Sequence, residues 1–156
     1  MASTLLLHYD PARPGQATWS HVNNQGELTS RITSGSLDDA AVVAEQHKVV
    51  VLLDSTNVHL NQVQLPTSNR QKMLRAIPYA LEEQLAEDIE NFHFVIGNTD
   101  PNYGTPVAGI RKDTLEALLA TFHQAGIKID AIIPDAICSP AAPDQWSVLL
   151  LSLIHI

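Results

Sequence analysis

The fold of this chain is decided by one unbroken apolar run, Val49-Val50-Val51-Leu52-Leu53. A strand with only one buried face alternates apolar and polar residues, whereas a strand buried on both faces is apolar throughout. The run therefore predicts a strand buried on both faces, as in the central sheet of an α/β protein.

Upstream of this run, the pattern predicts three antiparallel strands. Residues 4–9 are typical of a buried strand. The side chains of residues 16–23 alternate between two faces, as expected of a second strand. Asn23-Asn24-Gln25-Gly26 is a hairpin turn signal, after which residues 27–32 return as a third strand.

A helix is predicted between these strands and the apolar run. Ser36 is a preferred N-cap residue, and Asp38 and Asp39 stand in the first turn, where the helix dipole favours negative charge. We expect the helix to cover residues 37–46. Three antiparallel strands, a helix and a buried strand form the opening of a ribonuclease-H-like α/β layer.

A second unit follows the buried strand. Its predicted elements are strands at residues 57–65, 92–96, 107–110 and 127–133, a helix from about residue 67 to 89, and a helix from Asp113 that ends at Gly126. The order βαββαβ is the ferredoxin-like pattern. We therefore expect a ferredoxin-like subdomain at residues 57–139, inserted into a ribonuclease-H-like subdomain of residues 1–56 and 140–156. Residues 145–151 would add a strand to that first subdomain.

Composition narrows the class of protein. The chain has 156 residues, with 17 acidic and 9 basic side chains, a formal charge of −8 and one cysteine. The negative charge argues against nucleic acid and anionic lipid as main partners, and a single cysteine fits a reducing compartment. We find no signal peptide and no run of the roughly 18 apolar residues that a membrane-spanning helix needs. Residues 146–156 stop within an apolar run, so we expect a truncated chain.

The loop after the first strand is a poor candidate for binding phosphate. The seven glycines are scattered and form neither a P-loop nor a dinucleotide fingerprint. An actin-like nucleotide site needs an Asp followed two residues later by Gly, but the residue two after Asp10 is Ala12. Pro11 and Pro14 flank it and lack N–H donors. We therefore expect no nucleotide hydrolysis and no cofactor.

The histidines, the cysteine and the serines show no catalytic or metal-binding pattern. No histidine pair has metal-finger spacing. His8 and His21 fall on adjacent predicted strands, where we expect a hydrogen-bonded structural pair. Cys138 has no nearby basic residue to lower the pKa of its thiol, so we expect a small core residue. No serine stands in a Gly-x-Ser-x-Gly turn. We expect neither a catalytic residue nor a metal ligand.

The segment from Thr67 to Asn91 carries an unusual charge pattern. Apolar residues recur at three- and four-residue steps, as expected of one helix face, at Leu74, Ile77, Leu81, Leu85 and Ile89. The basic residues come first, and the acidic ones follow at Glu82, Glu83, Glu87, Asp88 and Glu90. The helix dipole favours the reverse order. Pro78 lies between the two blocks and predicts a kink or a break. A break would place Pro78 at the first position of a second helix.

These five acidic residues allow two interpretations. Charge runs are commonly solvated faces of a helix. The alternative is a docking surface for a basic partner, because complementary charge supplies specificity and speeds association.

Residues 74–94 read LRAIPYALEEQLAEDIENFHF. This segment resembles the signature of the L proteins of bacterial type II secretion systems, where a proline, an aromatic residue, an acidic pair and a His-Phe stand at set spacing. The preceding Val63-Gln64-Leu65-Pro66 is similar to the family's lead-in to the helix. The resemblance is tight over residues 63–97 and loose over the rest of the chain.

The resemblance implies an actin-like fold without evident nucleotide hydrolysis. It also implies a scaffold in the inner-membrane platform that recruits the cytoplasmic secretion ATPase, pairs with itself and pairs with the M protein of the same system. In that family a membrane helix and a periplasmic domain follow, so this chain would lie at the cytoplasmic face and reach the membrane only through a segment that it lacks. Two alternatives remain, an actin-like nucleotide-binding protein and an M-like scaffold of type IV pilus assembly.

Overall fold

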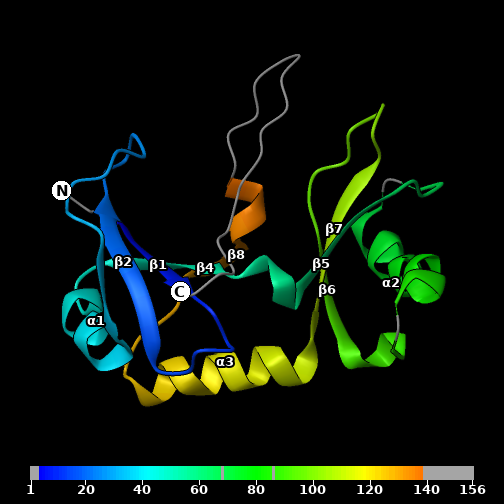
Figure 1. The fold of residues 1–156 in the computed structure, drawn as a ribbon. Coiled ribbons are helices and arrows are strands. Elements are labelled where there is room, and N and C mark those ends of the chain that lie inside the picture. Colours follow the sequence, from blue (N-terminus) through cyan, green and yellow to red (C-terminus); the bar gives the residue numbers. More distant parts are fainter. Residues whose placement is uncertain (1–3, 68, 86, 139–156) are drawn as a thin grey trace, which may run out of the picture. The chain divides into compact units, whose positions relative to one another are not determined.

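The apolar run at residues 49–53 lies in β4 (Lys48–Leu53), an inner strand of a five-stranded sheet. In the computed structural model, which describes residues 4–67, 69–85 and 87–138, β4 pairs in parallel with β1 (Thr4–Tyr9) on one side and with β8 (Ala131–Pro134) on the other (Figure 1). Val49, Val51 and Leu53 are almost completely buried. Val50, on the opposite face, is 9% exposed, so the prediction of a strand buried on both faces is confirmed.

The outer part of this sheet is antiparallel. The strand order is β3-β2-β1-β4-β8, with β2 (Gln16–Val22) paired to β1 and β3 (Thr33–Ser36) paired to β2. The third strand was expected at residues 27–32, and this position is wrong. There the chain makes one isolated bridge, between Val22 and Leu28, and the Ser30 side chain accepts the N–H of His21. Because this side chain takes the place of a backbone partner, the regular ladder begins only at Thr33.

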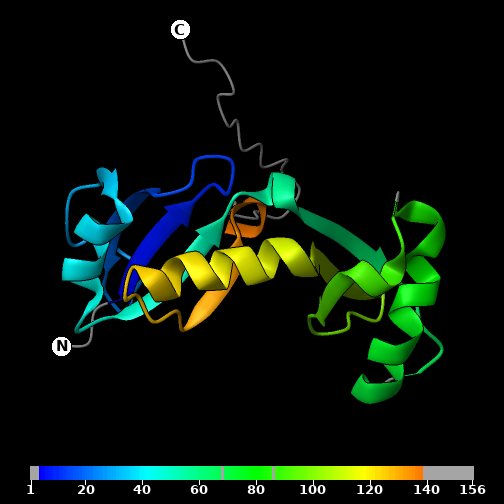
Figure 2. The same ribbon diagram turned by 90° about the horizontal axis from the view of Figure 1, so that it is seen from below.

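Helix α1 (Leu37–Ala44) begins where the sequence predicts. Ser36 is its N-cap, and the Asp39 N–H donates to the Ser36 hydroxyl at 3.1 Å while the Ser36 N–H donates to the Asp39 carboxylate at 3.1 Å. Such a capping box satisfies two orphan donors of the first turn. The side-chain and backbone hydrogen bonds from Ser36 also lower the pKa of Asp39. The helix packs beside β2 and β3 through Leu37, Ala40 and Ala44 (Figure 2).

The second unit comprises residues 56–124. Its elements are β5 (Val58–Val63), α2 (Arg70–Leu81), β6 (Phe92–Ile96), β7 (Thr105–Arg111) and α3 (Lys112–Gln124), with short 3-10 turns at Ser55–Asn57, Glu82–Gln84 (η2) and Ile89–Asn91 (η3). The three strands form an antiparallel sheet in the order β5-β7-β6. Gly126 follows α3 with φ +75, a conformation that favours glycine and ends the helix as predicted.

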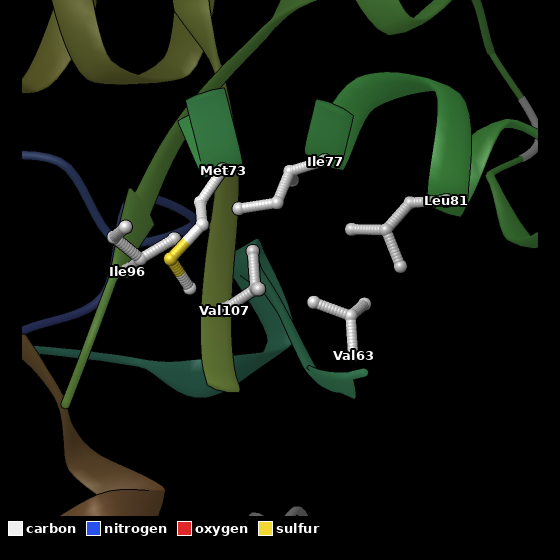
Figure 3. Close-up of a cluster of buried hydrophobic side chains, with 6 residues drawn as sticks. All are labelled: Val63, Met73, Ile77, Leu81, Ile96 and Val107. Carbon is white, nitrogen blue, oxygen red and sulfur yellow. The ribbon is translucent and has the colours of Figure 1, made fainter. Parts of the chain in front are cut away.

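The core of this unit lies between α2 and one face of its sheet. Met73, Ile77 and Leu81 stand four residues apart and therefore share one helix face. They meet the strand residues Val63, Ile96 and Val107, and Figure 3 shows the six side chains pointing toward one another. The predicted helix stripe began at Leu74, but that residue is 37% exposed and Met73 takes the buried position.

The last predicted strand belongs to the first unit, not to the second. The chain returns at Ala125, and β8 pairs with residues Val50–Leu53 of β4. The Asp130 carboxylate accepts the Val49 N–H at 2.8 Å and the Asp130 N–H donates to the Val49 carbonyl at 2.9 Å, which ties the start of β8 to β4. Among the described residues, the second unit therefore has the order βαββα and lacks the fourth strand of the expected βαββαβ pattern, and the boundary expected at residue 139 is wrong. The strand expected at residues 145–151 lies outside the described residues.

Among the residues that the structure describes, no helix is long and apolar enough to cross a membrane.

Candidate functional site

The five acidic residues singled out in the sequence do not lie on one helix. Helix α2 ends at Leu81, and Glu82 and Glu83 lie in the 3-10 turn η2. The backbone is extended at Leu85, and Glu90 lies in η3. The prediction of a helix to residue 89 is wrong, and so is the placement of Pro78 at the start of a second helix, because Pro78 lies within α2.

Helix α2 ends at Leu81 because its next turn has no apolar side chain to bury. Glu82, Glu83 and Gln84 offer no apolar side chain to the core, and all three are exposed. In a continued helix, Glu83 and Glu87 would repel each other at i,i+4. By leaving the helix, the chain brings Leu85 against the core cluster of the second unit instead.

One of the five carboxylates is held by a basic residue. Glu87 forms an ion pair with Arg111 at the end of β7. The Arg111 guanidinium also binds Asp113 through two parallel hydrogen bonds, of 3.0 Å and 2.6 Å. This hydrogen bonding lowers the pKa of Asp113 to about 2 and raises the pKa of Arg111. Lys112 donates to the backbone carbonyl of Glu90 at 2.7 Å, so its ammonium holds the backbone of η3.

The last turn of α2 and the segment that follows it line an open groove, which we call the Tyr79 groove. It has a volume of about 630 Å³. It is lined by three apolar or aromatic residues, Tyr79, Leu85 and Ile89, and by four acidic ones, Glu82, Glu87, Asp88 and Glu90. Glu83 is not part of this lining. The structure thus brings four of the five predicted residues together and leaves one outside.

Tyr79 is the residue of this groove that the charge pattern did not reveal. It stands in the last turn of α2 and is 73% exposed. Because successive helix residues are about 100° apart, Tyr79 lies on the side of α2 opposite to the buried Ile77. In the sequence, the helical spacing of apolar residues identifies the buried positions of α2. A large aromatic residue outside that spacing was the signal that could have revealed Tyr79.

A second cluster of polar residues lies at the sheet of the first unit. His8, Asp54 and Asp135 are the only group of three or more potential metal ligands in the described part of the chain, with ligand atoms within 4.8 Å of one another. His8 is in β1, and Asp54 and Asp135 directly follow β4 and β8. The carboxyl ends of parallel strands meet at one edge of a sheet, which explains how distant residues come together. Sequence reasoning missed this group because it depends on the pairing of β8.

The contacts of Asp135 indicate a structural role for this cluster. One carboxylate oxygen lies 3.1 Å from His8 Nε2, and the other accepts the Ser55 N–H at 3.0 Å and the Ser55 hydroxyl. The Ser55 hydroxyl oxygen in turn accepts the Ala136 N–H at 2.8 Å. Burial raises the pKa of Asp135, but the hydrogen bonds from Ser55 and His8 outweigh it, and the pKa is lowered. Both oxygens are thus engaged by the protein, and the cluster secures the chain where the second unit begins.

The predicted pairing of His8 with His21 is wrong. In the β1–β2 register, His21 stands opposite Leu5 and His8 stands opposite Thr18, so the two rings are three positions apart. His21 instead meets His47 edge to face, with ring centroids 4.7 Å apart. Burial, together with the neighbouring His47, lowers the pKa of His21.

Cys138 is exposed, so the prediction of a core residue is wrong. Partial burial of the thiol and the nearby Asp135 carboxylate raise its pKa. A raised pKa keeps the thiol protonated, and a protonated thiol is a weak nucleophile.

In the loop after β1, two backbone N–H groups donate to Asp10 of the same loop. The Ala12 N–H donates to the Asp10 side chain at 2.9 Å, and the Arg13 N–H donates to the Asp10 carbonyl at 2.9 Å. The Arg13 side chain lies 3.7 Å from the Asp10 carboxylate. Phosphate cradles need backbone N–H groups that point at the ligand. In this loop, Asp10 accepts those donors instead.

Sequence comparison identifies relatives along nearly the whole chain. The family "Type II secretion system (T2SS), protein L" matches residues 15–153. Type II secretion system protein L of Dickeya chrysanthemi is 33% identical over 84% of this chain, and its counterpart from Pectobacterium carotovorum is 28% identical over 93%. The aligned region covers 33% and 35% of those proteins, so the chain spans about a third of their length.

Solved structures agree on the fold. The cytoplasmic domain of EpsL, an inner-membrane component of the type II secretion system of Vibrio cholerae, superimposes with a TM-score of 0.78 at 22% identity, over 91% of this chain and 61% of that one. A chain of the PilM-PilN type IV pilus biogenesis complex gives 0.57 at 17% identity, over 85% of this chain and 46% of the other. At these identities the similarity shows the fold alone. The predicted α/β class, with a second unit inserted into the sequence of the first, is confirmed, whereas the four-stranded ferredoxin-like order expected of that second unit is wrong, because its described residues form three strands.

Proposed function

Because this chain belongs to the protein L family of type II secretion systems, we propose that it is a cytoplasmic scaffold of the inner-membrane secretion platform and recruits the secretion ATPase. The family match over residues 15–153 carries this proposal. The similarity in fold to a cytoplasmic domain supports the same position in the cell. We further propose contact with the M protein of the system and self-association, with the membrane reached through a part of the protein outside these residues.

The proposed role is that of a binding protein and not of an enzyme. The Asp135 cluster is engaged in internal hydrogen bonds, and the thiol of Cys138 has a raised pKa. Neither arrangement presents an activated nucleophile or a poised general base.

The acidic segment Glu82–Glu90 is the surface that we propose for partner binding. Its five carboxylates are all exposed, and one of them is paired with Arg111. Complementary charge across an interface raises the association rate and favours the correct partner. A basic surface on the ATPase would meet this requirement.

Copurification with the cognate ATPase tests the proposal. We expect the tagged chain to retain the ATPase at low salt. We expect combined charge reversal at Glu82, Glu83 and Asp88 to reduce retention at least ~10-fold, because it replaces attraction by repulsion. Retention unchanged by the reversal would remove the acidic segment from the proposal, and no retention by the unsubstituted chain would contradict the scaffold role itself.

Nucleotide binding and pilus assembly have less support. Asp10 accepts the N–H groups of its own loop, and the curated relatives above are secretion proteins. Calorimetry with Mg-ATP is the direct measurement, and we expect no heat of binding. Tight binding that is lost in Asp10→Ala would favour an actin-like nucleotide-binding protein instead.

A further inference from the structure

The Tyr79 groove has the composition of a binding site for a positively charged side chain. Tyr79 is exposed, while Leu85 and Ile89 are half-buried and form the apolar part of the lining. Tyrosine is enriched at interface hot spots because its ring combines a large apolar area with low conformational entropy. Its face also attracts cations through the ring quadrupole.

The charges around the groove are not balanced within the described residues. Arg111 is already shared by Glu87 and Asp113, and Lys112 is directed to a backbone carbonyl. In the described part of the chain, the carboxylates of Glu82, Asp88 and Glu90 have no basic partner. Three carboxylates therefore line the same groove as one exposed aromatic ring, and a cation is the ligand that such a site attracts.

Arginine fits this arrangement better than lysine. A planar guanidinium stacks on an aromatic face and forms two parallel hydrogen bonds to a carboxylate. A volume of about 630 Å³ accommodates one or two long side chains, which is less than a whole helix occupies. The apolar lining by Leu85 and Ile89 suits an aliphatic neighbour of the arginine.

We propose that the Tyr79 groove binds an arginine-bearing segment of a partner protein, with the guanidinium stacked on Tyr79 and paired with Asp88 or Glu82. The identity of the partner as a secretion component rests on the proposed function. The chemistry of the groove does not, since it follows from the exposed ring, the apolar lining and the unbalanced carboxylates.

A fluorescent peptide of about twelve residues that combines arginine and leucine is the probe. We expect it to bind the full chain, and we expect a peptide with glutamine in place of arginine to bind at least ~10-fold more weakly. Tyr79→Ala and Asp88→Lys should each weaken binding at least ~10-fold, whereas Tyr79→Phe should bind like the parent because it keeps the aromatic face.

Matched controls come from the same unit. Tyr103 is 70% exposed but does not line the groove, and Glu116 is an exposed acidic residue outside it. Tyr103→Ala and Glu116→Lys should change binding less than ~2-fold. Circular dichroism verifies that each variant is folded. Equal loss in the controls, or equal binding of the arginine and glutamine peptides, would overturn the proposal.

The same variants in the ATPase copurification separate this inference from the proposed function. Retention that is lost in Tyr79→Ala and kept in Tyr103→Ala supports both. If the unsubstituted chain retains the ATPase and Tyr79→Ala retains it equally, the groove is not where this partner binds, and the scaffold role stands. If the unsubstituted chain does not retain the ATPase, the scaffold role fails, and the peptide titration alone decides on the groove.

Discussion

Replacement of Ile77 by alanine should destabilise the second unit by about 2–5 kcal/mol. Ile77 is completely buried between α2 and the sheet, where it meets Val63, Val107 and its neighbours on the helix (Figure 3). The alanine variant loses the transfer free energy of three carbon atoms and leaves a cavity that the surrounding side chains fill only in part.

Leu74→Ala is the matched control on the same helix. Leu74 is 37% exposed, so its truncation removes less buried area and leaves an open surface instead of a cavity. We expect a cost of at most about 1 kcal/mol, because only part of the 1.5–3 kcal/mol available from full burial is lost. Each variant removes three carbon atoms from α2, and the expected difference between them rests on the burial of the two positions.

Hydrogen exchange measured by mass spectrometry is the suitable assay, because it reports on each unit separately. A loss of about 2 kcal/mol corresponds to about 30-fold faster exchange, since 1.4 kcal/mol is a factor of ten. The amides of β6 and β7 should show this acceleration in Ile77→Ala, while those of β1 and β4 should not. Similar exchange in the two variants would refute the assignment of Ile77 to the core.

Three further substitutions have defined expected outcomes. Ser36→Ala removes the N-cap and should lower the stability of the first unit by about 1 kcal/mol, measured by urea unfolding against Ser34→Ala. Gly104 has φ +90, and an added Cβ would lie 2.6 Å from the Val63 carbonyl oxygen. Gly104→Ala should therefore lower the hydrogen-exchange protection of β5 and β7 by more than about 1 kcal/mol. Gly26→Ala is the comparison, because an added Cβ there would meet no atom within 4 Å. The pKa of Asp135 is lowered in the folded state, so its contribution is present above the unfolded pKa of about 3.9 and is lost as the pH falls below that value. Thermal unfolding should therefore shift to lower temperature below about pH 4, and Asp135→Asn should flatten this dependence; an unchanged acid profile in Asp135→Asn would contradict it.

Most of the elements could be predicted because they depend on local signals. The period of two in residues 16–22 and the continuous apolar run in β4 reflect how side chains alternate across a strand. The Ser36 cap and the stop at Gly126 depend on backbone groups within one helical turn. The motif at residues 74–94 identified the family, which the match over residues 15–153 confirms.

The errors occurred where distant parts of the chain compete. A strand after α3 has the same local pattern whichever sheet it joins, and only the available edge of β4 assigns β8 to the first unit. Helical spacing continues from Leu81 to Leu85 and Ile89, yet η2 interrupts it because Leu85 reaches the core from an extended backbone. In both cases packing overrides a local preference worth only a fraction of a kcal/mol per residue.

The order of residues was sufficient to establish the α/β class, the helix caps and the family, since each depends on groups that are close in sequence. The candidate sites were decided by tertiary structure. His8 and Asp135 are 127 positions apart and meet only because β1, β4 and β8 are parallel neighbours. Likewise, Arg111 approaches Glu87 across 24 positions, while Tyr79 is left exposed among the remaining carboxylates. Charge balance in a site depends on distance in space, and that distance exists only once the sheet has formed.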